Sequence, residues 1–399
     1  MSRAHFVYAL TLSILVLAIS WKQQHNPALT HRVSGVEVPR YTPGVALAIS
    51  LSAKYLEAAC GENGKFIYQR SVYSGDMSTS YNVVRHAGAI YSLGMLNAGH
   101  PNPEIVGTML RAAEFMRTVY MGQDTRSRTL AVWSNPKPKQ SQATLGGAGL
   151  GLAALAAVDR ARPNAVPLEE LEAVGRFILF LQRSDGSFVS KYDSTYGLIE
   201  GSKSLYYPGE AAVGLISLYE LDHDPRWLTA AGKALAYLAR NRAGVSPIPA
   251  DHWALIATAR LLPYCREPEC VKSQLVGHAV HICNRILQDQ IQIGSDRRLE
   301  GGFDVAGRTT PTATRLEGLL AALEFLPSDN SGERLAIEGA VKRGIAFLLR
   351  SEITAGPYAG GMPGAVLDSN NPHAANIRID YVQHALSAWL RYQSMFGER

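Results

Sequence analysis

Titratable side chains recur at the starts of five of six apolar segments in this sequence of 399 residues. In register, the first turns of these segments carry Arg85-His86, Gly146-Gly147, Gly209-Glu210, Asp251-His252, Leu316-Glu317 and Gln383-His384. Five of the six pairs hold a titratable residue although the rest of each segment is apolar. Taken alone, Asp251 could be only a helix N-cap and His384 only a hydrogen-bonded core histidine. Their repetition at one position favours a shared functional site.

Glu210 and Asp251 are the predicted acid and base of this site. Glu210 follows a Tyr-Tyr-Pro-Gly bend, and apolar surroundings would raise its carboxyl pKa, which suits a general acid. Asp251 would act as the general base, with His252 as a further catalytic candidate. Tyr207 and Trp253 would stack on a sugar, and two carboxylates are what glycoside hydrolysis uses. The structural alternative for Glu210 is a first-turn glutamate favoured by the helix dipole.

Further candidates lie on the first, fifth and sixth segments. An arginine that neutralises a uronate carboxylate, with a tyrosine or histidine that moves the C5 proton, would suit β-elimination or C5-epimerisation. This chemistry is the main alternative to hydrolysis. The remaining catalytic candidates are His86, Glu317 and Asp380, and the remaining substrate-binding candidates are Tyr81, Arg85, Asp304, Arg315, Arg378 and His384.

The same histidines and glutamates could also bind a metal ion, because imidazole and carboxylate groups suit zinc or manganese. No two of them have the short spacing of an HExxH motif, and they are spread over several segments. We therefore assign no metal and no cofactor to the site.

The elements that position these residues are six pairs of helices. Asn102-Pro103 and Asp224-Pro225, like Thr42-Pro43, place a capping side chain before a proline, which predicts the start of an amphipathic outer helix. The segments that carry the candidates are apolar on nearly all sides, so each should be a buried inner helix. They cover residues 80–96, 144–158, 206–221, 250–262, 312–326 and 379–392.

The connections between the predicted helices are unequal in length. Inner helices lead to outer ones through short turns such as 222–224 and 327–330. Outer helices lead to inner ones through long segments around Gly64-Lys-Phe66, Gly186-Ser-Phe188 and Gly301-Gly-Phe303, which we interpret as loops with short strands. Long loops and helix N-termini then meet at one face, where binding sites are common and anions are favoured.

The six-hairpin order, the run YYPGEAAVGLISLYEL at 206–221 and the Gly-Phe loops resemble the six-hairpin glycosidase superfamily. The resemblance covers roughly residues 42–395 and implies an all-α (α/α)6 toroid. The superfamily includes glycoside hydrolases, polysaccharide lyases and sugar epimerases. In such a toroid the first and sixth hairpins meet, so two clusters should be neighbours: Tyr81, Arg85 and His86 on the first, and Arg378, Asp380 and His384 on the sixth.

The N-terminus predicts export. Arg3 and His5 precede an apolar run, Phe6 to Ser20, which has the build of a secretory signal and is short for a membrane span. We therefore divide the chain into a signal peptide or membrane anchor at 1–25, a linker at 26–41 and the toroid at 42–399. The protein would be periplasmic or extracellular, and held at the inner membrane if the segment is not cleaved. Cys265 and Cys270 would then form a structural disulfide.

The amino-acid composition and net charge indicate which kinds of ligand the protein could bind. Hydrophobic residues make up 47% and charged residues 18%, which indicates a globular protein with a large core. The formal charge of +5 is spread along the chain, which disfavours nucleic acid and gives a weak bias toward anionic ligands. We expect an enzyme acting on a polysaccharide or oligosaccharide. Hydrolysis is preferred, a uronate lyase or C5-epimerase is the alternative, and a non-catalytic glycan-binding or scaffold toroid is the third possibility.

Overall fold

Helices of two kinds alternate along the chain in the computed structural model, which describes residues 44–266, 270–292, 294, 296–327, 332–366 and 371–397. The outer helices are α2 (Val45–Ala59), α4 (Pro103–Tyr120), α6 (Leu168–Phe180), α8 (Pro225–Asn241), α10 (Lys272–Gln288) and α12 (Gly332–Ser351). The inner helices are α3 (Val83–Gly99), α5 (Leu145–Ala161), α7 (Tyr207–Asp222), α9 (His252–Leu261), α11 (Thr309–Leu323) and α13 (Ile379–Phe396).

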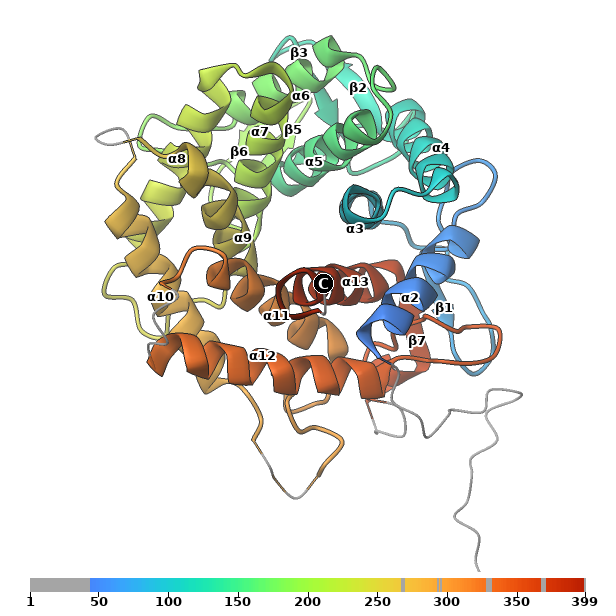
Figure 1. The fold of residues 1–399 in the computed structure, drawn as a ribbon. Helices are drawn as coiled ribbons and strands as arrows, with labels where there is room; N and C mark the ends of the chain where they lie inside the picture. The colour runs from blue at the N-terminus through green and yellow to red at the C-terminus, as the bar shows by residue number, and fades with distance from the viewer. Residues whose placement is uncertain are drawn as a thin grey trace, which may run out of the picture. The chain divides into compact units, whose positions relative to one another are not determined.

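The inner helices form a closed ring. Each packs against the next along the chain, and α13 packs against α3, while the outer helices surround them (Figure 1). The (α/α)6 toroid expected from the sequence is therefore confirmed, and each of the six predicted inner segments overlaps an inner helix.

The predicted difference between inner and outer helices follows from burial. All residues of α5 from Leu145 to Val158 are buried, as expected for a helix covered on every side. Outer helix α8 buries one stripe, and the side chain of Asp224 caps it by accepting from the Arg226 backbone N–H. Asn102 caps α4 in the same way, whereas Thr42 and Pro43 lie outside the described residues.

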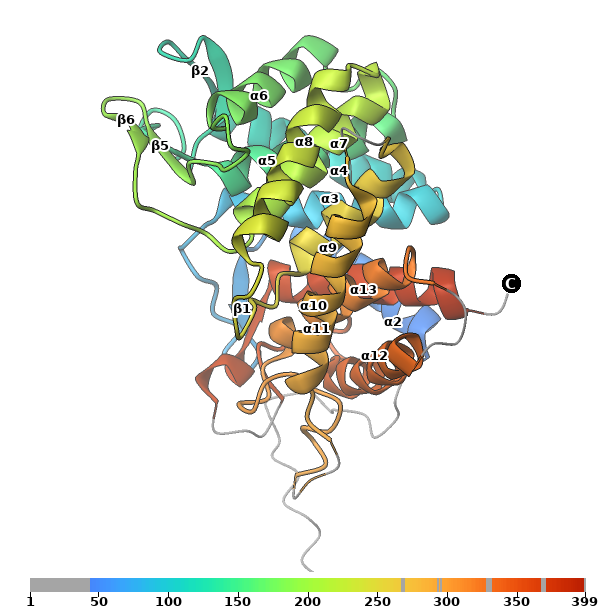
Figure 2. The same cartoon turned by 90° about the vertical axis from the view of Figure 1, so that its left-hand side faces the viewer.

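Short strands occupy the connections from outer to inner helices, and Figure 2 shows them toward one end of the helices. Antiparallel pairs join β1 (Gln69–Ser71) to β7 (Asn376–Arg378) and β2 (Met121–Asp124) to β3 (Thr129–Val132). A three-stranded sheet contains β4 (Gln142–Thr144), β5 (Lys191–Asp193) and β6 (Gly197–Ile199). Two short 3-10 helices, Leu262–Tyr264 and Pro372–Ala375, complete the regular structure of the described residues.

Cys265 and Cys270 form the expected disulfide. None of the described helices is long and apolar enough to cross a membrane. The predicted signal or anchor at 1–25 and the linker at 26–41 lie outside the described residues.

Candidate functional site

A cavity of about 430 Å³ lies among the inner helices, and all six of them contribute side chains to its lining. Most of these side chains come from the first turns, so the cavity opens on the face that the loop lengths predicted. Nine of the predicted site residues line it: Arg85, Tyr207, Glu210, His252, Trp253, Arg315, Arg378, Asp380 and His384.

Two histidines from different helices meet in this cavity. The rings of His252, at the start of α9, and His384, in α13, are 5.8 Å apart between centroids and nearly perpendicular. Glu317 of α11 lies behind both rings, with Oε2 2.7 Å from Nδ1 of His384 and 3.9 Å from Nε2 of His252. One carboxylate therefore holds His384 firmly and leaves His252 without a close partner.

The surroundings give the two imidazoles opposite charge states. Burial lowers the pKa of His252 well below its usual value, and the positive charges of His384 and Arg315 act in the same direction. Burial alone would also lower the pKa of His384, but Glu317 outweighs it and the pKa of His384 is raised. His252 is therefore a free base at neutral pH, and the contact with Glu317 favours the imidazolium form of His384, so one ring can accept a proton while the other donates one.

Glu210 is a third ionisable group in the cavity, placed in the first turn of α7. Its side chain is 6% exposed, and Oε2 has no hydrogen-bond partner among the described residues. Burial raises the pKa of Glu210 to about 8, so the carboxyl group is neutral at pH 7 and can donate a hydrogen bond. Gly146 makes room for it, since a Cβ there would lie 2.3 Å from Oε2.

Two arginines share the remaining carboxylate of the lining. Arg85 of α3 lies with Nε 2.9 Å from Oδ2 of Asp380, and Arg378 binds both oxygens at 2.5 and 2.9 Å. The ion pair between Arg85 and Asp380 confirms that the first and sixth hairpins meet. Because Asp380 already forms ion pairs with two arginines, it is a poor candidate for the catalytic base.

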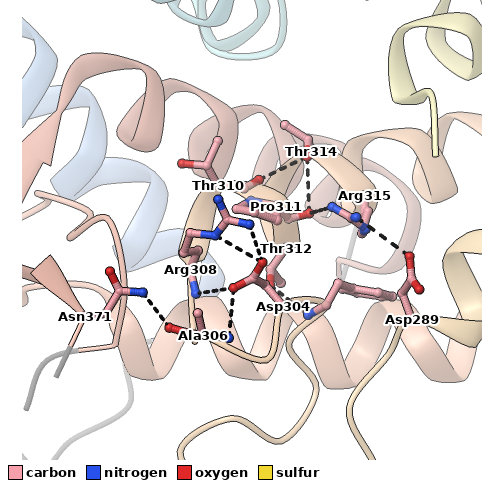
Figure 3. Close-up of polar contacts among 11 residues, drawn as sticks. Asp289, Asp304, Ala306, Arg308, Thr310, Pro311, Thr312, Thr314, Arg315 and Asn371 are labelled. Atoms are coloured by element: carbon pink, nitrogen blue, oxygen red, sulfur yellow. Dashed lines mark hydrogen bonds and ion pairs between the residues drawn. The ribbon is translucent and has the colours of Figure 1, made fainter. Parts of the chain in front are cut away.

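The first turn of α11 supplies a polar wall, drawn in Figure 3. Arg308, just before the helix, binds Oδ2 of Asp304 through Nε and an Nη at 3.1 and 2.7 Å. Arg315 donates to the backbone oxygen of Pro311 at 3.1 Å, and Thr314 donates to the backbone oxygen of Thr310 at 3.0 Å. Arg308, Thr310, Pro311, Thr314 and Arg315 all line the cavity.

The structure does not bring Tyr81 and His86 into this cavity. His86 is fully buried, and its ring nitrogens contact the Tyr81 hydroxyl at 2.7 Å and the backbone oxygen of Ala112 at 2.8 Å. Burial lowers the pKa of His86 to about 4, so it is a neutral core histidine between α3 and α4. Consecutive residues differ by about 100° around a helix, so when Arg85 faces the cavity His86 faces outward.

Asp251 and Asp304 also differ from their predicted roles. Asp251 is fully buried, caps α9 by accepting from the Ala254 N–H, and pairs with Arg242 at 2.8 Å outside the cavity lining. Asp304 shapes the turn before α11 by accepting from Ala306 and Arg308, and it does not line the cavity. The predicted pair of Glu210 as acid and Asp251 as base is therefore not available to one substrate.

Several cavity residues were not among the predicted site residues. Arg308, Thr310 and Thr314 belong to the start of α11, Tyr206 ends the loop before α7, and His373 lies in the 3-10 helix Pro372–Ala375. Tyr206 could have been found, since it precedes Tyr207 in the same bend. Its ring contacts His252 at 4.8 Å between centroids, so it helps to bury the base.

His252, Glu317 and His384 are also the described residues best placed to hold a metal ion, with ligand atoms within 4.8 Å of one another. Ligands bound to one zinc ion at about 2.0–2.2 Å in tetrahedral geometry lie more than 3 Å apart. The 2.7 Å contact between Glu317 and His384 is that of a hydrogen-bonded pair instead.

No model of a known protein family matches the sequence, and no curated protein matches it. Solved structures match its fold. A sugar epimerase from a ruminal bacterium has a TM-score of 0.70 at 12% identity, over 89% of this chain and 99% of that one. The cellobiose 2-epimerase from Spirochaeta thermophila has a TM-score of 0.60 at 15% identity, over 88% and 96%.

An inactive variant of an α-1,6-mannanase from Salegentibacter sp., in complex with α-1,6-mannotriose, matches with a TM-score of 0.59 at 11% identity, over 87% of this chain and 98% of that one. At these identities the similarity shows the fold. The expected fold is thus confirmed, and the chain is an (α/α)6 toroid with a cavity among its inner helices.

Proposed function

We propose that this protein is a carbohydrate-active enzyme that transfers a proton at a carbon next to a carbonyl or carboxyl group, as a sugar epimerase or isomerase does. One observation carries the proposal: two imidazoles from different helices face one cavity, and Glu317 lies 2.7 Å from His384 but 3.9 Å from His252, which favours the charged form of the first and the neutral form of the second. A neutral base and a charged acid poised together are what such a transfer needs.

The arrangement suggests the steps. His252 removes the proton from the carbon and becomes an imidazolium, while the electron pair moves onto the neighbouring oxygen to form an enolate. Neutral Glu210 and cationic Arg315 line the same cavity and can stabilise that oxygen. His384 then returns a proton, either to the opposite face of the same carbon or to the adjacent carbon. The first outcome is epimerisation. The second is isomerisation, in which the hydroxyl on the first carbon also gives its proton to the enolate oxygen and becomes the new carbonyl.

A sugar suits the rest of the lining. Tyr206, Tyr207, Trp253 and Tyr381 bring aromatic rings to a cavity that also carries many hydrogen-bonding groups. Aromatic faces pack on sugar rings, while polar groups fix the hydroxyls. Two of the structures that share this fold are sugar epimerases, which supports the same class of reaction here. We therefore propose an oligosaccharide or a monosaccharide as the substrate.

Glycoside hydrolysis is the second candidate, because Glu210 retains the raised pKa that a general acid requires. Hydrolysis also needs a second carboxylate, and the cavity does not offer a free one among the described residues. Asp251 pairs with Arg242 outside the lining, and Asp380 is bound by two arginines. The inactive mannanase variants replace two consecutive aspartates. This sequence contains no Asp-Asp pair.

A purely glycan-binding toroid is less well supported. His252 is 2% exposed, and neither of its ring nitrogens has a hydrogen-bond partner among the described residues. Glu210 is similarly buried and has one unpartnered oxygen. Burial of polar atoms without partners is destabilising by about 1–3 kcal/mol each, which favours a chemical use for them.

The test is solvent exchange. The purified protein would be incubated in D2O with neutral and acidic sugars and oligosaccharides, and proton NMR would follow deuterium entry and new sugars. We expect exchange at one carbon, reduced by about 10²-fold or more in H252N and H384N. H223N is the matched control, because His223 caps the far end of α7 in the left-handed conformation that asparagine tolerates.

Two results would contradict the proposal. New reducing ends without deuterium entry would indicate hydrolysis, and E210Q should then abolish the activity. Exchange that persists in H252N would remove the base from the mechanism. Formation of an unsaturated uronate, seen by ultraviolet absorbance, would retain the base but change the reaction to β-elimination.

We also propose that the protein works outside the cytoplasm. The apolar run Phe6–Ser20 supports this, and so does the Cys265–Cys270 disulfide, since such bonds persist in oxidising compartments. A fusion of residues 1–41 to alkaline phosphatase should be active in the periplasm of a Gram-negative host. An inactive, cytoplasmic fusion would refute export.

A further inference from the structure

The cavity contains more positive than negative charge. Four arginines line it, Arg85, Arg308, Arg315 and Arg378, against two carboxyl groups, Glu210 and Asp380. Glu210 is neutral at pH 7 because burial raises its pKa to about 8. Asp380 is thus the single ionised carboxylate of the lining within the described part of the chain.

The arginines differ in how fully they are paired. Arg308 forms a two-pronged ion pair with Asp304, which satisfies its charge. Arg85 and Arg378 share Asp380, which leaves one positive charge between them. These three side chains are therefore held in place by carboxylates, with one charge in excess.

Of the four arginines, Arg315 has the positive charge that is least balanced by a nearby carboxylate (Figure 3). Its Nε is buried without a hydrogen-bond partner among the described residues, and one Nη donates to the backbone oxygen of Pro311. The nearest carboxylate, Asp289, is 3.8 Å away and already binds Arg285 at 2.6 Å. A guanidinium that is 20% exposed and lacks a close carboxylate is costly to keep unless a ligand supplies one.

We infer that the substrate of this enzyme is an anionic sugar, and that Arg315 binds its carboxylate or phosphate group. The inference rests on the proposed function for the reaction, but the anion subsite itself rests on charge and geometry. Guanidinium binds both groups well because its parallel N–H donors match their oxygens.

The place of Arg315 also suits the chemistry. Arg315 lines the same cavity as His252 and Tyr206, and its positive charge acts on the pKa of both groups. An anionic group bound there sets the neighbouring carbon of the sugar near His252. If that group is a carboxylate, its pairing with Arg315 would also ease removal of the adjacent proton.

Calorimetric titration of the full chain tests the subsite directly. D-glucuronate and D-glucose 6-phosphate are the anionic probes, and D-glucose is the neutral one. We expect the anions to bind about 10- to 100-fold more tightly than glucose, the gain typical of a buried charge-assisted contact. The preference between glucuronate and the phosphate identifies the anionic group.

Variants assign the binding to one arginine. R315Q should lose the preference for anions, whereas R315K, which keeps the charge, should bind them with intermediate affinity. R176Q is the matched control, since Arg176 lies on outer helix α6, pairs with Glu172 at 3.2 Å and does not line the cavity. Circular dichroism and thermal unfolding would show that each variant is folded.

The inference fails if glucose binds the wild-type protein as tightly as both anions, if no anionic probe binds up to its solubility limit, or if folded R315Q binds them unchanged. These results are independent of deuterium exchange. Anion binding through Arg315 without exchange would overturn the proposed reaction and keep the subsite. Exchange on neutral sugars without a preference for anions would support the proposed reaction and overturn the anion subsite.

Discussion

The contrast between His252 and His384 comes from a single carboxylate. Both rings are buried in the same cavity, and burial lowers the pKa of each. Glu317 contacts His384 at 2.7 Å but is 3.9 Å from His252, so only His384 gains a strong ion pair. Protonation of His384 then makes protonation of His252 harder still, because the two charges would repel.

Replacement of Glu317 should therefore change the pH profile. His384 must be protonated to donate, so activity is lost as pH rises through its raised pKa. In E317Q no carboxylate counteracts the effect of burial, so the pKa of His384 falls. The alkaline limb of the kcat/KM profile then shifts to lower pH. At pH 8 the loss should approach the ~10²-fold effect of removing a general acid. The acid limb of the profile is set by His252 and stays at a pH below the usual pKa of histidine.

E324Q is the matched control for this profile. Glu324 follows α11 at its other end and pairs with Arg391, away from the cavity lining. Its pH profile should coincide with that of the wild type. Coincident profiles for E317Q and E324Q would show that Glu317 does not set the charge of His384.

The direction in which a single side chain faces could not be predicted from the sequence. The aligned segments placed titratable groups at the mouth of the ring, but two of the pairs contained two candidates each. Arg85 faces the cavity while His86 faces the core, and His252 faces the cavity while Asp251 faces Arg242. One step along a helix turns a side chain by about 100°, and helix starts are known from sequence only to within one or two residues.

At the scale of elements, small residues let the inner helices approach closely. A Cβ on Gly149 of α5 would lie 2.5 Å from the backbone nitrogen of Ala211 in α7, and one on Gly214 would lie 2.3 Å from the backbone oxygen of Gly149. The two helices thus touch through their backbones. This contact fixes the height and rotation of α7, and with them the position of Glu210 next to Ala211.

The G149A variant should separate these two helices. An added methyl group meets backbone rather than a side chain that can move, so the free energy of unfolding should fall by about 1–3 kcal/mol. G151A is the control, because its Cβ meets a methyl group of Val132 at 3.1 Å and no backbone atom of α7 within 4 Å. Urea unfolding measures both. Equal stability of the two variants would contradict a backbone contact between α5 and α7.

The elements themselves were well predicted. Proline after a capping residue gave the starts of α4 and α8, and apolar residues on all sides identified the inner helices. The start of α11 was placed at residue 312 but lies at Thr309. That shift hid Thr310 and Arg308 from the list of candidates. Arg308 has no cap signal of its own, since its place depends on Asp304 in the folded turn.

The whole ring is stabilised by a repeated contact between neighbouring hairpins. In four loops that follow an outer helix, a glycine with positive φ packs against a backbone oxygen of the next outer helix. A Cβ at these positions would lie 1.9–2.3 Å from that oxygen, and the pairs are Gly64 with Arg111, Gly186 with Lys233, Gly301 with Arg343, and Gly360 with Leu51. The last pair joins the loop after α12 to α2 and so closes the ring.

Closure of the ring at Gly360 can be tested against a glycine that lacks the contact. Gly360 has a φ of +83°, and a Cβ there would lie 2.0 Å from the Leu51 oxygen, whereas Gly201 has a φ of +77° with no atom within 4 Å. G201A should lose only the ~1–2 kcal/mol of the left-handed conformation, while G360A should lose about 3 kcal/mol or more in unfolding free energy. Hydrogen exchange should also show α2 opening more readily in G360A than in G201A, because α2 is the element released. Equal losses in the two variants would mean that backbone strain alone acts at Gly360 and that other contacts close the ring.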